Sequence, residues 1–204
     1  MTIKSIAFDV GGVLAASKVK RPRGVHEEMA RNFHIDLDSW FDAIDTPYGE
    51  AIIGKLSKKE ALSKVAKNLN TSPKHLEKLL LKAYQHHFTR NAELYNLAFK
   101  LKRAGYKIII LSDQWQVSKE ALIQEKDARK FNLVLVSCDI GVRKPSKEFF
   151  KLAINKSKCH PEEILFIDNR EWNLKPAKAL GINTILFKNN KQLIKSLKKL
   201  KILI

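Results

Sequence analysis

Four polar residues of this 204-residue chain come just after short apolar runs, and their types suit chemistry on an anionic group. They are Asp9, Ser112, Lys144 and Asp168. Together they supply a carboxylate nucleophile, a hydroxyl donor, a cation and an acidic metal anchor, which is the set that phosphoryl transfer requires. Each also has a purely structural explanation, as a turn residue, a helix cap or a loop charge. Their shared position after apolar runs is what favours catalysis.

Two glycines come shortly after Asp9 and give the backbone more conformational freedom there. Gly11 and Gly12 let the main chain approach a ligand closely, and the amide groups of such a turn can form a nest for an anion. The segment from Asp9 to Gly12 therefore predicts a phosphate-sized site at the end of the first apolar run.

The apolar runs themselves predict the elements that position these residues. They are rich in β-branched residues and alternate with helical patterns, which predicts a parallel sheet with helices on both faces. Parallel strands bring their carboxyl ends to one edge of the sheet, where ligands bind in such folds. We therefore expect an α/β fold with a Rossmann-like three-layer core. The expected strands are residues 3–8, 107–111, 133–136, 164–167 and 183–187.

The stretch between the first strand and residue 91 lacks a convincing strand and carries helix starts instead. Ser57 with Glu60 forms a capping box, and Ser72 before Pro73 supplies an N-cap. Asn91 is expected to cap the helix that follows. We interpret residues 16–90 as an inserted helical cap subdomain, and residues 1–15 with 91–204 as the core domain. A lid at this position can exclude water and select substrates.

Four ordered segments of the chain resemble the motifs of the haloacid dehalogenase superfamily. They are Phe8 to Leu14, Leu111-Ser112-Asp113, Arg143-Lys144-Pro145 and Phe166 to Asn169. Further matches, at Gly11, Tyr48 to Glu50, Gly54 to Glu60 and Gly141, are similar to small sugar-phosphate phosphatases, glucose-1-phosphate phosphatases included. The resemblance covers nearly the whole chain and implies a hydrolase, expected to be a phosphatase acting on a small phosphorylated metabolite.

The resemblance also implies a role for each matching position. Asp9 attacks phosphorus to give an aspartyl-phosphate, and Ser112 and Lys144 hold and neutralise the phosphoryl oxygens. Neighbouring residues are expected to bind the substrate: Gly11, Gly12, Asp113 and Arg143. Magnesium (Mg2+) is the implied cofactor, with ligands from Asp9, the Gly11 carbonyl, Asp168 and Asn169.

Two positions depart from the family pattern. Gly11 stands where most family phosphatases carry a second Asp, which protonates the leaving group and then activates water, and glycine cannot exchange a proton. Asn169 stands where the direct metal ligand is usually an acid, and a neutral carbonyl oxygen is a weaker ligand for magnesium. The sequence therefore predicts weakened metal binding unless Asp168 or Glu171 coordinates the ion. The missing acid predicts slow turnover, a good leaving group, or a substitute such as a substrate group or a cap residue.

Two other functions remain open at this stage. A 2-haloacid dehalogenase needs neither the second Asp nor a metal, and Trp172 is similar to an aromatic residue of that family, although packing of Trp172 against the sheet is the preferred interpretation. Such an enzyme needs an arginine for its substrate carboxylate, for which Arg90 and Arg31 are candidates. The second alternative is a weakly active or non-catalytic domain that binds a phosphorylated ligand.

Composition limits the class of partner and compartment. The formal net charge is +17, but 30 of the 38 basic residues are lysines spread over every expected helix. This spread argues against nucleic acid and fits a small anionic substrate. Only two cysteines are present, no apolar run is long enough to span a membrane, and no signal peptide is recognised, so a cytoplasmic location is expected. The oligomeric state is not assigned.

Some features in and around the cap remain as secondary expectations. Substrate selection is expected from cap residues, the candidates being Arg21, Arg23, His26, Tyr48 and Glu50. His86 and His87 are given a structural role, because adjacent helical residues point in different directions and no third ligand is evident. The amphipathic pattern from Lys191 to Ile204 predicts a helix docked on the chain's own sheet.

Overall fold

The computed structural model describes residues 2–18 and 24–202. Its main sheet has five parallel strands in the order β5-β4-β1-β6-β7. All five match the expected strands to within two residues at each end. Their bounds are β1 (Ser5–Phe8), β4 (Lys107–Ser112), β5 (Leu133–Val136), β6 (Ile164–Asp168) and β7 (Asn183–Leu186).

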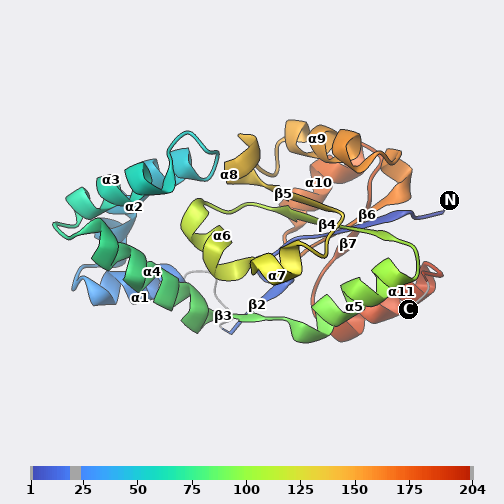
Figure 1. Cartoon of the computed structure of the whole chain (residues 1–204), viewed down its shortest axis with the longest axis horizontal. Coiled ribbons are helices and arrows are strands. Elements are labelled where there is room, and N and C mark those ends of the chain that lie inside the picture. Colours follow the sequence, from blue (N-terminus) through green and yellow to red (C-terminus); the bar gives the residue numbers. More distant parts are fainter. Residues whose placement is uncertain (1, 19–23, 203–204) are drawn as a thin grey trace.

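Helices cover both faces of this sheet, because the residues of each strand alternate between two hydrophobic clusters (Figure 1). Ile108 and Ile110 pack with α5 (Ala92–Arg103) and α11 (Asn190–Lys199). Ile109 and Leu111 pack with α9 (Lys147–Ser157) and α10 (Glu171–Ala179). The three-layer α/β architecture predicted from the strand–helix alternation is therefore confirmed.

Four helices lie between the first strand and the rest of the core, and we call them the cap helices. They are α1 (Gly24–Asn32), α2 (Leu37–Ala51), α3 (Lys58–Asn68) and α4 (Pro73–His87). The predicted capping box of Ser57 and Glu60 and the N-caps at Ser72 and Asn91 are all present. The cap helices enclose their own hydrophobic cluster, which includes Trp40.

Two short strands join the cap helices to the core, in a stretch where no strand was predicted. β2 (Ala15–Ser17) and β3 (Phe88–Arg90) form an antiparallel pair that we call the β2–β3 ribbon. Three-residue strands are too short for an alternating pattern to reveal. The ribbon brings both connections of the cap helices to the same place (Figure 1).

The remaining helices are short or lie at the end of the chain. They are α6 (Gln116–Leu122), α7 (Glu125–Ala128), α8 (Ser137–Ile140) and the 3-10 turn η1 (Pro161–Glu163). The predicted docking of the C-terminal helix on the sheet is confirmed, since Leu193 and Leu197 of α11 are fully buried in the core cluster.

Candidate active site

Three neighbouring strands carry acidic or hydroxyl groups at their carboxyl ends. Asp9 follows β1, Ser112 is the last residue of β4 and Asp168 is the last residue of β6. Because β1 lies between β4 and β6 in parallel register, these residues share one edge of the sheet. The Asp9 amide donates to the Ile167 carbonyl at 2.9 Å, which continues the ladder to the nucleophile position.

Lys144 joins two of these strand ends. Its ammonium donates to Asp9 Oδ1 at 2.8 Å, to Asp168 Oδ2 at 2.9 Å and to the Leu111 carbonyl at 3.0 Å. These three bonds use all three ammonium protons. The Lys144 backbone amide also donates to Asp113 Oδ1 at 3.0 Å, which fixes the loop. Lys144 is only 2% exposed, so the ammonium is held as an internal cation.

Burial and charge shift the pKa values of this cluster. Burial raises the pKa of Asp9 to about 6, although the Lys144 ammonium acts in the opposite direction. Burial alone would lower the pKa of Lys144, but the nearby carboxylates outweigh it and raise that pKa above its ordinary value. Burial also raises the pKa of Asp113. At neutral pH Asp9 is thus mainly a carboxylate beside a charged lysine, which is the state a nucleophile needs.

Asp168 is held by the start of the following helix. The Arg170 amide donates to Oδ1 at 2.7 Å and the Asn173 side chain donates to Oδ2 at 2.9 Å. Asn169 is exposed and its side chain lies against Gly12, where an added Cβ would come within 2.3 Å of the amide nitrogen. Gly12 also has a φ of +82°, so both space and backbone conformation require glycine here.

Gln114 is a site residue that the sequence analysis missed. Its side-chain amide donates to the Ser112 hydroxyl at 3.2 Å. The same amide nitrogen is the nearest atom to a Cβ built on Gly11, at 3.9 Å. The Gln114 backbone amide donates to the Ser137 hydroxyl at 3.0 Å, which orients the residue. Ser112 is fully buried and does not line the cavity described next, whereas Gln114 does. A single glutamine after a strand carries no recognisable pattern, so no signal in the sequence marks it.

A cavity of about 170 Å³ separates the strand ends from the cap helices. From the core it is lined by Asp9, Gly11, Asp113, Gln114, Lys144 and Asn173, and by the two arginines Arg143 and Arg170. The cap contributes Val25, His26, Tyr48, Ile52 and Tyr84. Gly12, Ser112, Asp168 and Asn169 are not among the lining residues, so Asp9 and Gly11 face the cavity while the ends of β4 and β6 lie beneath or beside it.

The substrate-selecting residues expected in the cap fall into three groups. His26 and Tyr48 line the cavity. Glu50 does not line it and pairs with Lys64 at 3.2 Å. Arg21 and Arg23 lie outside the described residues.

The cavity-lining His26 is oriented by Trp40. The Trp40 indole donates to His26 Nδ1 at 3.0 Å, so the neutral ring carries its proton on Nε2. In this tautomer the imidazole presents a donor from Nε2 and its only acceptor nitrogen is already engaged by the indole.

A second cavity, of about 240 Å³, lies by the β2–β3 ribbon and holds the proposed carboxylate-binding Arg90. Arg90 donates to both oxygens of Asp127, at 2.6 and 3.0 Å, and does not line the Asp9 cavity. Because this charged pair is mutually satisfied and no strand of the main five-stranded sheet ends at this cavity, we assign the chemistry to the Asp9 cavity. Arg31, the other candidate, is exposed on α1 and also absent from the cavity lining.

The preferred interpretation of Trp172 as a residue packed against the sheet is wrong. Its side chain is 58% exposed, with the Arg170 guanidinium 5.5 Å from the ring centroid. Trp172 is the second residue of α10, on the face turned away from the sheet. It does not line the Asp9 cavity either, so the structure gives it no place in dehalogenase chemistry.

The residues of this site fit a magnesium ion. Asp9 and Asp168 are both buried carboxylates, and both contact the same single buried ammonium. Two buried carboxylates against one buried cation leave a deficit of positive charge, and carboxylate oxygens are the ligands that magnesium prefers. The donor set therefore suits a hard divalent cation at this edge of the sheet.

A parallel α/β sheet with an internal lysine between two strand-end carboxylates defines a hydrolase-type site, and the comparison with known families agrees. The chain belongs to the haloacid dehalogenase-like hydrolase family, whose model matches residues 3–181. The predicted family membership is thereby confirmed.

Individual relatives are more distant. The bifunctional epoxide hydrolase 2 of Rattus norvegicus is 23% identical over 97% of this chain, and the chain spans only 34% of that protein. The glyceraldehyde 3-phosphate phosphatase of Methanocaldococcus jannaschii is 25% identical over 90% of this chain and 84% of its own length. This chain thus corresponds to a part of the first relative and to most of the second.

Among solved structures, a HAD family enzyme of Bacteroides thetaiotaomicron matches with a TM-score of 0.74 and 23% identity. The match covers 94% of this chain and 98% of that one. That enzyme was solved in complex with magnesium and inorganic phosphate. At this identity the likeness shows a shared fold. Within the described residues, no helix is both long and apolar enough to cross a membrane.

Proposed function

We propose that this chain is a magnesium-dependent phosphatase that acts on a small phosphorylated metabolite through an aspartyl-phosphate at Asp9. The observation that carries the proposal is the Lys144 ammonium held within 3 Å of both Asp9 and Asp168. The magnesium and phosphate bound by the Bacteroides enzyme, and the phosphatase activity named for the archaeal relative, support it.

In this proposal the Asp9 carboxylate oxygen attacks phosphorus while the bond from phosphorus to the substrate oxygen breaks. Gln114 lines the cavity and donates a hydrogen bond toward the phosphoryl oxygens, while the positive charge of Lys144 limits the build-up of negative charge. Ser112 positions the Gln114 side chain through the hydrogen bond between them. Water then attacks phosphorus, releasing phosphate and restoring the Asp9 carboxylate. Asp9, the Gly11 carbonyl and Asp168 would hold magnesium, which would supply further positive charge at the phosphoryl group.

The size and charge of the cavity support a small, doubly anionic substrate. About 170 Å³ is below the size of sites for drug-sized ligands, so a short carbon skeleton is favoured. Arg143 and Arg170 line the same cavity as Lys144, while Lys144 already neutralises part of the buried acids. We propose that the two guanidinium groups bind a second anionic group of the substrate, such as a carboxylate or another phosphate.

The proton for the leaving oxygen has no donor at Gly11. His26 lines the cavity from the cap side. We propose that solvent or the substrate itself supplies the proton. This arrangement predicts slow turnover on poor leaving groups.

The test is phosphate release from an aryl phosphate and a panel of small phosphorylated acids and sugars, with and without magnesium. The native chain is compared with Asp9→Asn and with a control on the cap surface, Asp45→Asn. We expect magnesium-dependent release that is lost in the Asp9 variant and kept in the control. Equal background release by all three proteins contradicts the proposal, and metal-independent halide release from a 2-haloacid would replace it with the dehalogenase reading.

A further inference from the structure

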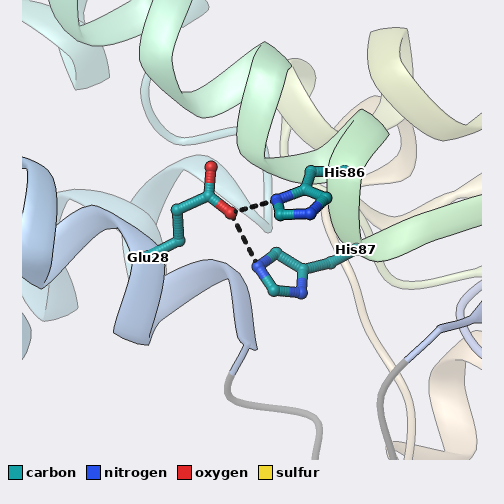
Figure 2. Close-up of side chains that lie close together, drawn as sticks. All are labelled: Glu28, His86 and His87. Atoms are coloured by element: carbon teal, nitrogen blue, oxygen red, sulfur yellow. Dashed lines mark hydrogen bonds and ion pairs between the residues drawn. The ribbon is translucent and has the colours of Figure 1, made fainter.

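Two adjacent histidines and a glutamate meet beside the β2–β3 ribbon (Figure 2). Glu28 comes from α1, while His86 and His87 are the last two residues of α4. Glu28 Oε2 lies 2.7 Å from His86 Nδ1 and 2.9 Å from His87 Nε2. The expectation that no third ligand accompanies the histidines is therefore wrong. A residue 58 positions away in the sequence supplies it, which helical spacing alone does not reveal.

The two histidines contact the carboxylate in different ways. His86 Nδ1 makes a hydrogen bond with Glu28, and the His86 side chain is 68% exposed. His87 is 8% exposed, and its Nε2 has no hydrogen-bond partner, because the nearby carboxylate oxygen is close but poorly aligned. A buried imidazole nitrogen without a hydrogen bond is costly, since desolvation is not compensated. The cluster thus contains a buried imidazole nitrogen that lies 2.9 Å from a carboxylate oxygen and makes no hydrogen bond.

The three ligand atoms lie close enough together to be brought around one tetrahedral cation by small movements. All three lie within 4.8 Å of one another. Around zinc, with bonds of about 2.0–2.1 Å to histidine nitrogen and carboxylate oxygen, neighbouring ligand atoms stand roughly 3.3 Å apart. Outward shifts of about half an ångström in the flexible Glu28 side chain bring the observed contacts to that value. The exposed side of His86 leaves room for water as the fourth ligand.

We propose that Glu28, His86 and His87 bind a zinc-type divalent transition metal ion. Imidazole nitrogens select such ions over magnesium, which prefers oxygen ligands. None of the three residues lines the Asp9 cavity, so this site is separate from the proposed catalytic metal. The metal replaces the proton of the hydrogen bond between His86 Nδ1 and Glu28 Oε2.

The location gives the metal a structural consequence. The His87 carbonyl accepts from the Lys18 amide at 2.9 Å, and the next residue, Phe88, begins β3 and lines the Asp9 cavity. A metal bound here ties α1 to the end of α4 at the point where the cap helices join the ribbon. Metal binding therefore reduces the motion of α1 and the end of α4 relative to the Asp9 cavity.

The test is calorimetric titration with zinc in the presence of excess magnesium, so that the Asp9 site is already supplied. We expect one zinc per chain in the native protein. His86→Ala removes the exposed ligand and should lower the affinity at least about tenfold, because even loss of an outer-shell partner costs about 10–100-fold. His75→Ala, an exposed histidine of the same helix, is the matched control and should bind as the native chain does.

A second readout separates this site from the catalytic one. Cobalt in place of zinc should give a visible absorption band that persists in Asp9→Asn and disappears in His86→Ala, with a zinc-dependent rise in melting temperature following the same pattern. Absence of saturable zinc binding in the native chain overturns the proposal and leaves the cluster as an ion pair. Unchanged binding in His86→Ala also overturns it.

Discussion

The substitution Gly11→Asp tests the most unusual feature of the site, the absence of a proton-transfer group beside Asp9. Gly11 does not have a positive φ, and a Cβ added there meets only the Gln114 amide nitrogen, at 3.9 Å. That is an ordinary van der Waals contact, so a side chain fits without displacing the backbone. The new carboxylate would line the cavity and accept a hydrogen bond from Gln114.

The expected gain follows from the chemistry that the carboxylate adds. General acid–base catalysis contributes roughly 100- to 10,000-fold in rate. The added negative charge lies next to Asp9 and Asp113, whose pKa values are already raised by burial, and this repulsion offsets part of the gain. We therefore expect kcat to rise by the lower limit of this range, about 100-fold. This corresponds to an activation barrier lower by about 2.7 kcal/mol.

The assay compares kcat for two substrates that differ in leaving group. With an alkyl phosphate, whose leaving oxygen needs a proton, Gly11→Asp should accelerate turnover, whereas an activated aryl phosphate should respond much less. Gly11→Asn is the matched control, because it has the same shape and cannot exchange a proton at neutral pH. Equal effects of Asp and Asn, or no difference between the substrates, would refute the reasoning.

Three further predictions rest on charged side chains. Lys144→Met leaves two buried carboxylates unpaired and should lower the free energy of unfolding by about 3–5 kcal/mol in denaturant titration, with the exposed Lys147→Met as an unaffected control. Arg143→Gln should raise KM about tenfold with kcat nearly unchanged, since the lost contact is equal in ground and transition states; a fall in kcat alone would contradict this. Arg90 lowers the pKa of Asp127, so the stability from this pair is present above an unfolded-state pKa of about 3.9 and is lost as pH falls below it. The difference in melting temperature between the native chain and Arg90→Met should shrink across that acid range, and a constant difference would exclude the linkage.

The sheet and its helices were accessible from the sequence because their signals are local. Each strand is an apolar run of four to six residues, and each helix start at Ser57, Ser72 and Asn91 carries its own capping residue. Parallel strands have their carboxyl ends at one edge of the sheet, and this inference placed Asp9 and Asp168 on the same edge. These inferences need no knowledge of contacts between distant residues.

The features that the sequence did not reveal depend on such contacts. Gln114 becomes a site residue only because the loop after β4 places its side chain near Gly11. Glu28 meets His86 only after α1 and α4 pack together, and the exposure of Trp172 depends on which side of α10 faces the sheet. Residue type and spacing do not encode these orientations. The predicted division into a core and a cap subdomain, and the roles assigned to each site residue, stay predictions.

Trp115 connects the loop after β4 to the cap helices. It follows Ser112 by three residues, yet it is fully buried in the hydrophobic cluster of the cap helices, and its indole donates to the Tyr84 hydroxyl at 3.1 Å. Local unfolding of the cap would bring this large side chain into water, at a cost of about 1.5–3 kcal/mol for a buried hydrophobe of this kind. Amide hydrogens of the two regions should therefore exchange with solvent through a shared opening event.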